Sequence, residues 1–478
     1  MALALVWVVV RLATSTGQWA DHIEQFVRAH GREWGYHKHP PFATWLLAGA
    51  IALFGPAVAW PYLLASSCML GTAFFTHRVA CRLLGRRAAA LAILIWGLQY
   101  PFSFRASLFN HDTVMILCVS AAAWALLHAL SGGRTARVWW LGVGVASALA
   151  FLSKYQAVVP ITGLAFGAWR GGALASPTGR HGVLVAGGAA AVLVAPHLAW
   201  LLAGHDAALA YATQEGHLLP WAGRASNVLG FLVQQLRYLI APLLFVGLVL
   251  LLPKRPMDAG ARETPQVGVW MVALVAIPLV ATVLAGPLFG LALQNHWGYQ
   301  ALQFVGLWLA WRVTARSAAS VRQWIGVALL VHAIALGIAV ATADAMPSRT
   351  GRHNESRFPA QAVADAVMRD WRASTSCPLA IVVGPYFESG IVSVYNGGTA
   401  RVLEDGDFAK SPWIAPADLR RWGAVHVSLD PKALPTIGVS RTGSFDVSAA
   451  APPPANHVYW AIVPPPGCAS YEPGLPPR

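Results

Sequence analysis

The sequence predicts a polytopic all-α membrane protein with a small α/β domain at its C-terminal end, outside the membrane. Of the 478 residues, 56% are hydrophobic and 11% are charged, whereas a soluble domain usually carries about 25% charged residues. The mean hydropathy is +0.53. Apolar runs near the length of a membrane span recur along most of the chain. Runs of this length and number predict a bundle of transmembrane helices.

About eleven or more transmembrane helices are expected, because an apolar run of about 20 residues crosses a bilayer. Several runs are shorter than that, so tilted, half-length or merged helices would change the number. The stretch 42–54 is short, and we expect it to form a helix lying at the membrane interface. The expected spans are 2–17, 59–80, 88–104, 113–130, 138–153, 156–169, 183–203, 229–252, 267–288, 298–312 and 321–341.

The basic residues indicate the orientation of these spans. Clusters of Arg and Lys lie in alternate loops, and such loops face the cytoplasm by the positive-inside rule. The other loops, the segment 18–41 among them, are then extracytoplasmic, as is everything after about residue 342. The basic clusters are Arg82, Arg86 and Arg87; Arg134 and Arg137; Arg170 and Arg180; Lys254, Arg255 and Arg262; and Arg312, Arg316 and Arg322.

The net charge of +14 raises nucleic acid as an alternative partner. The basic residues do not form one patch, because they are divided among short clusters between apolar runs. This distribution is typical of membrane topology, and we therefore expect membrane lipids and no nucleic acid as partners.

The tail differs from the rest of the chain in composition, and we divide the protein into a transmembrane domain, 1–341, and an outer domain, 342–478. "PAQAVADAVMRDWRAS" reads as an amphipathic helix, "CPLAIVVGPYFESGIVSVY" as two β-rich runs around a Gly-Pro turn, and "ADLRRWGAVHVSLD" as a helix followed by a strand. Alternating helices and strands predict a small α/β domain. Cys377 and Cys468 both lie in it, and in an oxidising compartment a disulfide between them is as plausible as two free thiols.

The first outer loop, "DHIEQFVRAHGREWGYHKHPP" at 21–41, is dense in ionisable residues although the chain is so apolar. Asp21 follows the first span directly. Partial desolvation there would raise the pKa of its carboxyl group and so its basicity, as a general base requires. The alternative is a helix N-cap, because Asp21 with Glu24 three residues later resembles a capping box.

A divalent metal is an open alternative for the histidines of this loop. Imidazole and carboxylate groups are ligands of Zn²⁺, but no pair here has a firm ligand spacing. The sequence identifies no cofactor with certainty. The candidates are His22, Glu24, His37 and His39, with His217 in "QEGHLLPWAGR" as the distant residue that could complete a site.

Three charged residues in later outer loops could join the same face. Asp112 begins a span and could cap that helix or act as a second functional acid. Lys154 lies between two apolar runs, where it could extend outward to water or bind a phosphate. Arg105 lies nearby on the same side, and a cation at the interface suits a lipid-linked phosphate.

The motifs of the first loop resemble those of the polytopic GT-C glycosyltransferases. The order of a first span, Asp21, a gap and then "WGYHKHPPFATWLL" is similar to the bacterial family related to protein O-mannosyltransferases and to the lipid A aminoarabinose transferase, a family like glycosyltransferase family 39. "NHD" at 110–112 and "LSKY" at 152–155 resemble later segments of that family. The resemblance covers residues 1–340 well and the tail loosely.

The sequence departs from the family pattern at three positions. The second acid of the family's Asp-Glu pair is replaced by His22, with Glu24 two residues on. Residue 39 is His where many relatives have Lys. Residue 38 is Lys where some relatives have an acid that is thought to help hold a metal.

The resemblance implies a transferase that moves a sugar from a polyprenyl-phosphate donor to an acceptor at the periplasmic face of a bacterial inner membrane. By this analogy Asp21 is the general base of an inverting attack, and Asp112 orients the sugar or the acceptor. The implied contacts with the donor phosphate are Lys154, Arg105 and His39, and the implied contacts with substrate are Tyr36, Tyr155, His22 and Glu24.

Two other classes of function stay open at this stage. A transporter or lipid flippase would need charged or broken helices at the membrane midplane and paired halves. A structural subunit of an envelope assembly would not need Asp21 for its function. The sequence does not identify the sugar, and the acceptor could be lipid A, another lipid, a glycan or a protein.

Overall fold

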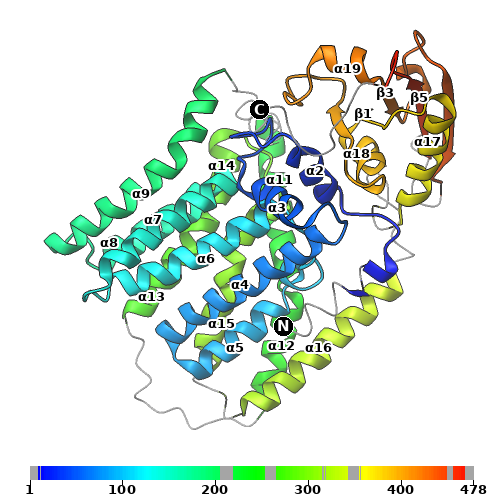
Figure 1. Ribbon diagram of the computed structural model, residues 1–478. Coiled ribbons are helices and arrows are strands. Elements are labelled where there is room, and N and C mark those ends of the chain that lie inside the picture. The colour runs from blue at the N-terminus through cyan, green and yellow to red at the C-terminus, as the bar shows by residue number, and fades with distance from the viewer. Residues whose placement is uncertain are drawn as a thin grey trace.

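The computed structural model describes residues 9–10, 12–204, 219–252, 265–314, 317, 319–342, 355, 357–448 and 456–468. It consists of a large helical part and an α/β part that packs on one end of it (Figure 1). In the helical part, helix contacts follow the order α15, α5, α4, α6, α7 and α9. The helices are α2 (Ala20–Ala29), α3 (Phe42–Phe54), α4 (Trp60–Leu84), α5 (Arg86–Gly97), α6 (His111–Ala129), α7 (Ala136–Ser153), α8 (Val158–Arg170), α9 (Pro177–Leu202), α11 (Trp221–Tyr238), α12 (Ile240–Leu251), α13 (Pro265–Met271), α14 (Ile277–Phe289), α15 (Tyr299–Thr314) and α16 (Val321–Thr342).

Four short helical segments connect or continue these helices. They are η1 (Tyr100–Phe102), η2 (Tyr155–Ala157), η3 (Val272–Ala276) and η4 (Asn295–Gly298). Segment η3 has π-helical geometry and joins α13 to α14 in one continuous run. The helix expected at 42–54 is present as α3, with the predicted bounds.

Among the described residues, fewer helices are long and apolar enough to cross a membrane than the eleven predicted for the whole chain. In the described ranges, five helices are long and apolar enough, and a sixth results if α11 and α12, bent by 47°, form one span. Helices α5, α8 and α15 coincide with expected spans but have only 12, 13 and 16 residues. Half of the first expected span, 2–17, lies outside the described residues.

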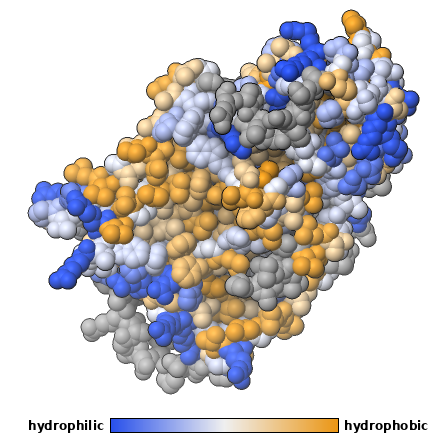
Figure 2. Space-filling model, in the orientation of Figure 1, coloured by the Kyte–Doolittle hydropathy of each residue, from blue (hydrophilic) through white to orange (hydrophobic). Residues whose placement is uncertain are grey.

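The surface of the helical part is that of a multi-pass membrane protein. Figure 2 shows apolar side chains over most of this part, with hydrophilic ones gathered on the α/β part and at the opposite ends of the helices. Helix α9 is the clearest case, because it is strongly apolar and yet only 11% of its most apolar 18-residue stretch is buried. Such a surface is stable against lipid and would be costly in water.

The α/β part contains one mixed five-stranded sheet in the order β2-β1-β3-β5-β4. Strand β1 pairs in parallel with β2 and β3, while β5 pairs antiparallel with β3 and β4. The predicted α/β character of the tail is therefore present in the described residues. The elements are α17 (Ala360–Ser374), β1 (Ile381–Gly384), α18 (Tyr386–Tyr395), β2 (Arg401–Glu404), α19 (Pro416–Trp422), β3 (Ala424–Ser428), a short turn η5 (Pro431–Ala433), β4 (Arg441–Asp446) and β5 (His457–Val463).

One element of the tail was predicted wrongly. The second β-rich run, after the Gly-Pro turn, is helix α18 instead of a strand. Eight of its ten residues are buried, so its β-branched side chains reflect burial on several faces and not a strand. A short apolar run cannot be assigned to helix or strand by periodicity alone.

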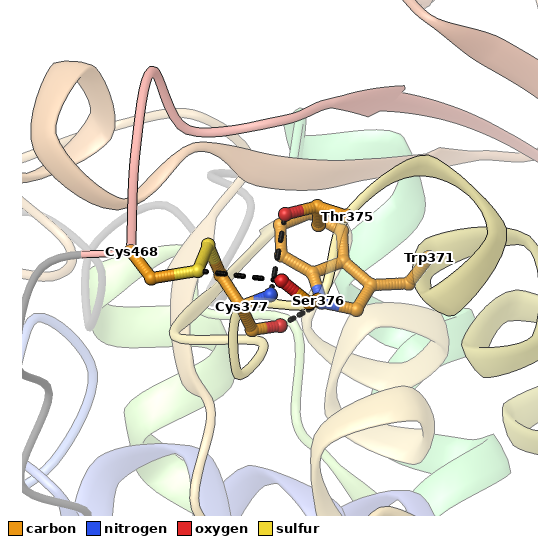
Figure 3. Close-up of a disulfide and its surroundings, with 5 residues drawn as sticks. All are labelled: Trp371, Thr375, Ser376, Cys377 and Cys468. Carbon is orange, nitrogen blue, oxygen red and sulfur yellow. Dashed lines mark hydrogen bonds between the residues drawn. A yellow bond between two sulfur atoms is a disulfide. The ribbon is translucent and has the colours of Figure 1, made fainter.

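Cys377 and Cys468 form a disulfide, with their Cα atoms 5.0 Å apart (Figure 3). The bond joins the start of the sheet to the segment after β5 and closes a loop of 91 residues. Beside it, the Trp371 Nε1–H donates a hydrogen bond to the Cys377 carbonyl oxygen at 2.8 Å, which ties α17 to the same point.

Candidate active site

Asp21 lies on the first turn of α2 and does not cap that helix. The N-cap position is Trp19, with no side-chain cap, and the Ala20 N–H donates instead to the Glu355 carboxylate at 2.9 Å. The Asp21 carboxylate accepts a hydrogen bond from Asn110 Nδ2 at 2.8 Å. The N-cap interpretation of Asp21 is therefore wrong, and its carboxylate remains available for chemistry.

The surroundings of Asp21 make it more basic than a free aspartate. Burial raises the pKa of Asp21, and the nearby charge of Glu24 raises it further, while the Asn110 hydrogen bond and Arg105 act in the opposite direction. Desolvation penalises the charged carboxylate, so the proton is held more tightly. A raised pKa is the property that a carboxylate general base needs.

Arg105 is a cation close enough to act on the charge of Asp21, and it forms no ion pair with a described residue. It follows η1, and its guanidinium lies over the Trp19 ring at 5.4 Å from the centroid. Its Nε is buried and has no hydrogen-bond partner in the described part of the chain. A half-buried guanidinium that forms no close ion pair with a described residue is suited to bind a phosphate in a bidentate manner.

Aromatic rings from four segments line the neighbourhood of Arg105. Tyr100 stacks on Tyr238 with 5.6 Å between centroids, and Tyr238 meets Tyr299 at 5.8 Å. The His296 ring lies 6.4 Å from the Tyr299 ring. These residues come from η1, α11, α15 and η4, so the fold gathers them from positions almost 200 residues apart in the sequence.

Asp112 and Lys154 form a buried pair. Lys154 Nζ donates to both carboxylate oxygens of Asp112, at 2.9 Å each, and the two side chains are 11% and 9% exposed. Asn110, not Asp112, caps α6 by accepting from the Thr113 N–H at 3.0 Å. Lys154 does not extend to water, and its charge is balanced by Asp112. His296 Nε2 lies 3.9 Å from the other side of that carboxylate.

A third group brings Glu24, His39 and His111 together. Each offers a ligand atom, and these atoms all lie within 4.8 Å of one another. The His39 and His111 rings are 4.1 Å apart. Burial and nearby cations hold the pKa of His39 well below its ordinary value, so its imidazole is neutral at physiological pH. Burial would raise the pKa of Glu24, but Arg28 and Lys38 outweigh it and lower the pKa to about 2.

These three residues fit a Zn²⁺ ion by their chemistry. The Ser153 carbonyl oxygen accepts from His111 Nδ1 at 3.0 Å, which fixes the tautomer. The lone pair of His111 Nε2 accepts from Gln25 Nε2 at 2.9 Å, a hydrogen bond that a bound metal would replace. Two neutral imidazoles and an ionised carboxylate are a typical zinc ligand set. The opposing factor is positive charge, because Glu24 Oε1 already accepts from Arg28 at 2.6 Å and from Lys38 at 3.0 Å.

Several other candidates from the sequence lie elsewhere. His22 is fully buried, and its ring nitrogens face Gln18 at 2.8 Å and the Phe109 N–H at 2.9 Å, so its contacts are internal. Tyr36 is 3% exposed and packs edge-on against Trp413. His37 lies against Glu404 at 3.4 Å. His217 falls outside the described residues.

Tyr155 is connected to the first outer loop through His197. Its hydroxyl lies 3.0 Å from His197 Nε2, and His197 Nδ1 lies 2.7 Å from the Trp34 carbonyl oxygen. Because that carbonyl can only accept, His197 donates through Nδ1 and accepts from the Tyr155 hydroxyl through Nε2. The arrangement links η2 to α9 and to the first outer loop, which is a structural role.

Sequence reasoning missed Asn110, His111 and His296 as members of these groups. Asn110 and His111 directly precede Asp112 in "NHD", and His296 lies in "NHWGYQA". Each sits beside a helix start, in a segment expected from the sequence to lie on the same side as Asp21, and that position was the signal that could have identified them.

The comparisons with known proteins concern the fold and one segment of the sequence. Residues 38–200 match the family described as dolichyl-phosphate-mannose-protein mannosyltransferase. The crystal structure of ArnT from Cupriavidus metallidurans bound to undecaprenyl phosphate is similar, with a TM-score of 0.62 and 15% identity over 96% of this chain and 97% of that one. The apo structure of the same protein gives a TM-score of 0.59 and 16% identity, covering 96% and 98%. No curated protein matches the chain in sequence.

The comparisons define the fold of the protein. The chain has the ArnT-like GT-C fold over nearly its whole length, and its first part matches the mannosyltransferase family. The resemblance to the GT-C glycosyltransferases that the first loop predicted is thereby confirmed. At this level of identity the likeness to ArnT defines the fold, and the chemistry must be argued from the residues of this chain.

Proposed function

We propose that this protein transfers a sugar from a polyprenyl-phosphate donor to an acceptor hydroxyl, with Asp21 as the general base. The observation that carries the proposal is the position of two groups beside the first outer loop: the Asp21 carboxylate, oriented by Asn110, and the guanidinium of Arg105, whose buried Nε has no hydrogen-bond partner among the described residues. A base and a phosphate-binding cation at one membrane boundary are the two groups that this reaction requires.

The reaction follows from these roles. Asp21 accepts the proton of the acceptor hydroxyl while that oxygen attacks the anomeric carbon of the donor sugar. The bond between the anomeric carbon and the phosphate oxygen breaks, and its electron pair leaves with the lipid phosphate. Attack opposite to the leaving group inverts the configuration of the anomeric carbon. Asn110 orients the Asp21 carboxylate through its hydrogen bond.

Arg105 is the better candidate for the leaving phosphate, and Lys154 the weaker one. Lys154 makes two short contacts, both with the Asp112 carboxylate, whereas Arg105 has no ion pair among the described residues. The Asp112–Lys154 pair, with His296 beside it, would then orient the sugar. His39 is neutral, so it would act on the phosphate as a hydrogen-bond donor and not as a cation.

Glu24, His39 and His111 would hold a divalent metal if the protein binds one. A metal there would supply Lewis-acid stabilisation for a phosphate oxygen. The residues of this chain that bind the donor and move the proton, Arg105 and Asp21, are separate from this set.

The proposed location is the bacterial inner membrane, with the site and the tail at the periplasmic face. The distribution of basic loop residues supports this orientation, and so does the disulfide in the α/β part, which needs an oxidising compartment. We propose residues 1–341 as the GT-C catalytic domain and 342–478 as the periplasmic domain. ArnT is described with undecaprenyl phosphate bound, which supports a donor of this class.

A complementation experiment tests the proposal. Envelope lipids and glycans from cells lacking the gene are compared by mass spectrometry with those from cells carrying wild type, Asp21→Asn or Asp365→Asn, an exposed acid on α17. We expect a sugar-sized mass to disappear in the deletion and to return with wild type and Asp365→Asn, but not with Asp21→Asn at equal expression.

The same experiment addresses the two alternatives. If Asp21→Asn restores the lost mass fully, Asp21 is not a catalytic base and the proposal fails. A transporter, a lipid flippase or a structural subunit of an envelope assembly would then be the better interpretation.

A further inference from the structure

The α/β part packs directly on the helix that carries Asp21. Helix α18 lies against α2 (Figure 1), and Gly390 is the point of closest approach. A Cβ atom at Gly390 would lie 2.3 Å from Ile23 Cγ2 and 2.9 Å from Val27 Cγ2, so only glycine fits there. The side chains of Ile23 and Val27 belong to the same apolar core as Ile391 of α18.

The seam between the α/β part and the first outer loop continues along residues 30–38. His30 Nε2 lies 3.1 Å from the Gly398 carbonyl oxygen. Gly31 leaves room for the Trp413 ring, which a Cβ atom would approach to 2.4 Å. Lys38 Nζ lies over the Tyr386 ring at 4.9 Å. The whole loop between Asp21 and His39 is therefore held from the side of the α/β part.

Charge is unevenly divided across this seam. On the loop side, Arg28 and Lys38 both bind one oxygen of Glu24. Arg28 is completely buried, and its Nε and Nη1 have no hydrogen-bond partner in the described part of the chain. An incompletely satisfied buried cation is costly unless another negative charge lies near it.

Glu404 supplies such a charge from the other side. It is the last residue of β2, is 2% exposed and faces His37 at 3.4 Å. Burial would raise the pKa of Glu404, but its contact with His37 and the charge of Arg28 lower it, so the group is ionised. The charges of the four ionised groups Glu24, Arg28, Lys38 and Glu404 sum to zero. Without Glu404, the charges of the other three sum to +1.

We propose that Glu404 is a positioning residue, by which the α/β part balances the charge of the first outer loop and holds Arg28 on Glu24 beside Asp21. This inference rests on the proposed function, because it assigns Glu404 an effect on the rate of sugar transfer. Glu404 acts through Arg28 and Glu24, and Glu24 in turn is one of the charges that set the basicity of Asp21. The α/β part is then a required half of the site and not an appended domain.

The test compares Glu404→Gln, Glu404→Asp and the control Asp365→Asn in the purified full-length protein. Turnover is measured as release of polyprenyl phosphate from a membrane lipid extract, and binding is measured with undecaprenyl phosphate. We expect Glu404→Gln to lower turnover about 10- to 100-fold, as loss of a supporting partner commonly does, with little change in the Kd for undecaprenyl phosphate. Glu404→Asp, which keeps the charge, should recover much of the rate.

The pH profile separates positioning from mere structural support. Asp21 is faced by Glu24 on its own helix, by Arg105 after η1, and by Asn110 and Asp112 at the start of α6. Loss of Glu404 leaves excess positive charge near Glu24, which favours the ionised form of Asp21. The acid limb of the Glu404→Gln profile should therefore move to lower pH than in wild type.

If Glu404→Gln has the same turnover and pH profile as wild type, the inference is wrong. If Asp21→Asn is inactive in the same assay, the proposed function still stands. Full activity of Asp21→Asn would instead defeat the proposed function. If Glu404→Gln does not fold, the double variant Lys38→Met/Glu404→Gln decides by gel filtration and melting temperature. In this double variant the charges of the remaining ionised groups, Glu24 and Arg28, again sum to zero, so the protein should fold. If it does not fold, the inference is also overturned.

Discussion

The Asp112–Lys154 pair allows the sharpest energetic prediction. The two 2.9 Å contacts and the burial of both side chains make this a desolvated ion pair. At an effective dielectric constant of about 20, two charges 2.9 Å apart attract each other by about 6 kcal/mol, and the cost of desolvating them cancels much of this. Removing only one partner leaves the other charge buried, which costs about 3–5 kcal/mol.

We therefore predict strong coupling between substitutions at these two positions. Asp112→Leu and Lys154→Met should each lower the free energy of unfolding by about 3–5 kcal/mol. The double variant removes both charges and replaces them with apolar side chains, so its loss should be far smaller than the sum of the two. The assay is equilibrium unfolding in mixed micelles with increasing SDS, followed by tryptophan fluorescence.

The control for this cycle is Asp365→Asn, an exposed acid on α17, which should change the free energy of unfolding by less than about 0.5 kcal/mol. If the double variant loses as much stability as the two single variants together, the two side chains do not depend on each other. The buried pair, and with it the assignment of Lys154 to Asp112 instead of to the phosphate, would then be refuted.

Four further predictions follow from the same structure. Because the pKa of Asp21 is raised, the rate of transfer should rise with pH through an inflection above the ordinary aspartate pKa of about 4. Asn110→Ala removes a hydrogen bond to the charged form of Asp21, so this variant should move the inflection to higher pH. Arg105→Gln should weaken binding of undecaprenyl phosphate at least tenfold in a direct binding measurement, whereas the exposed Arg372→Gln should not. Zinc content, measured by mass spectrometry of the purified protein, should fall in the double variant His39→Ala/His111→Ala and not in His426→Ala, and equal zinc in all three proteins would exclude the site. Cys377→Ser should lower the free energy of unfolding of the α/β part by at most about 4–5 kcal/mol, since the disulfide closes a 91-residue loop, and reductant should have no further effect on that variant.

The sequence predicted the parts of the fold that depend on local pattern. Helix α3 was predicted with its observed bounds, and α17, α19 and β3 were each expected as helix or strand because apolar spacing distinguishes the two. The span count was less predictable. Helices such as α15 are apolar because they are buried among other helices, and burial gives the same composition as contact with lipid.

The site was predictable in its residues but not in their pairing. Asp21, Asp112 and Lys154 stood out because charged groups next to apolar runs are rare. The sequence does not reveal that Lys154 binds Asp112, that Glu355 caps α2 or that Glu404 faces His37, because these contacts join segments 42, 335 and 367 residues apart. The first contact depends on the packing of α7 against α6, and the other two depend on how the first outer loop and α2 lie against the later part of the chain.

The most direct test of the central claim is a turnover measurement with the purified protein and its natural donor. Wild type and Asp21→Asn are incubated with a lipid extract from cells lacking the gene, and polyprenyl-phosphate sugar and free polyprenyl phosphate are quantified by mass spectrometry. The account predicts that wild type converts the first into the second and that Asp21→Asn is slower by about 10²- to 10⁴-fold while still binding undecaprenyl phosphate. Equal conversion by both proteins, or no conversion by wild type in the presence of the same extract's acceptors, would contradict it.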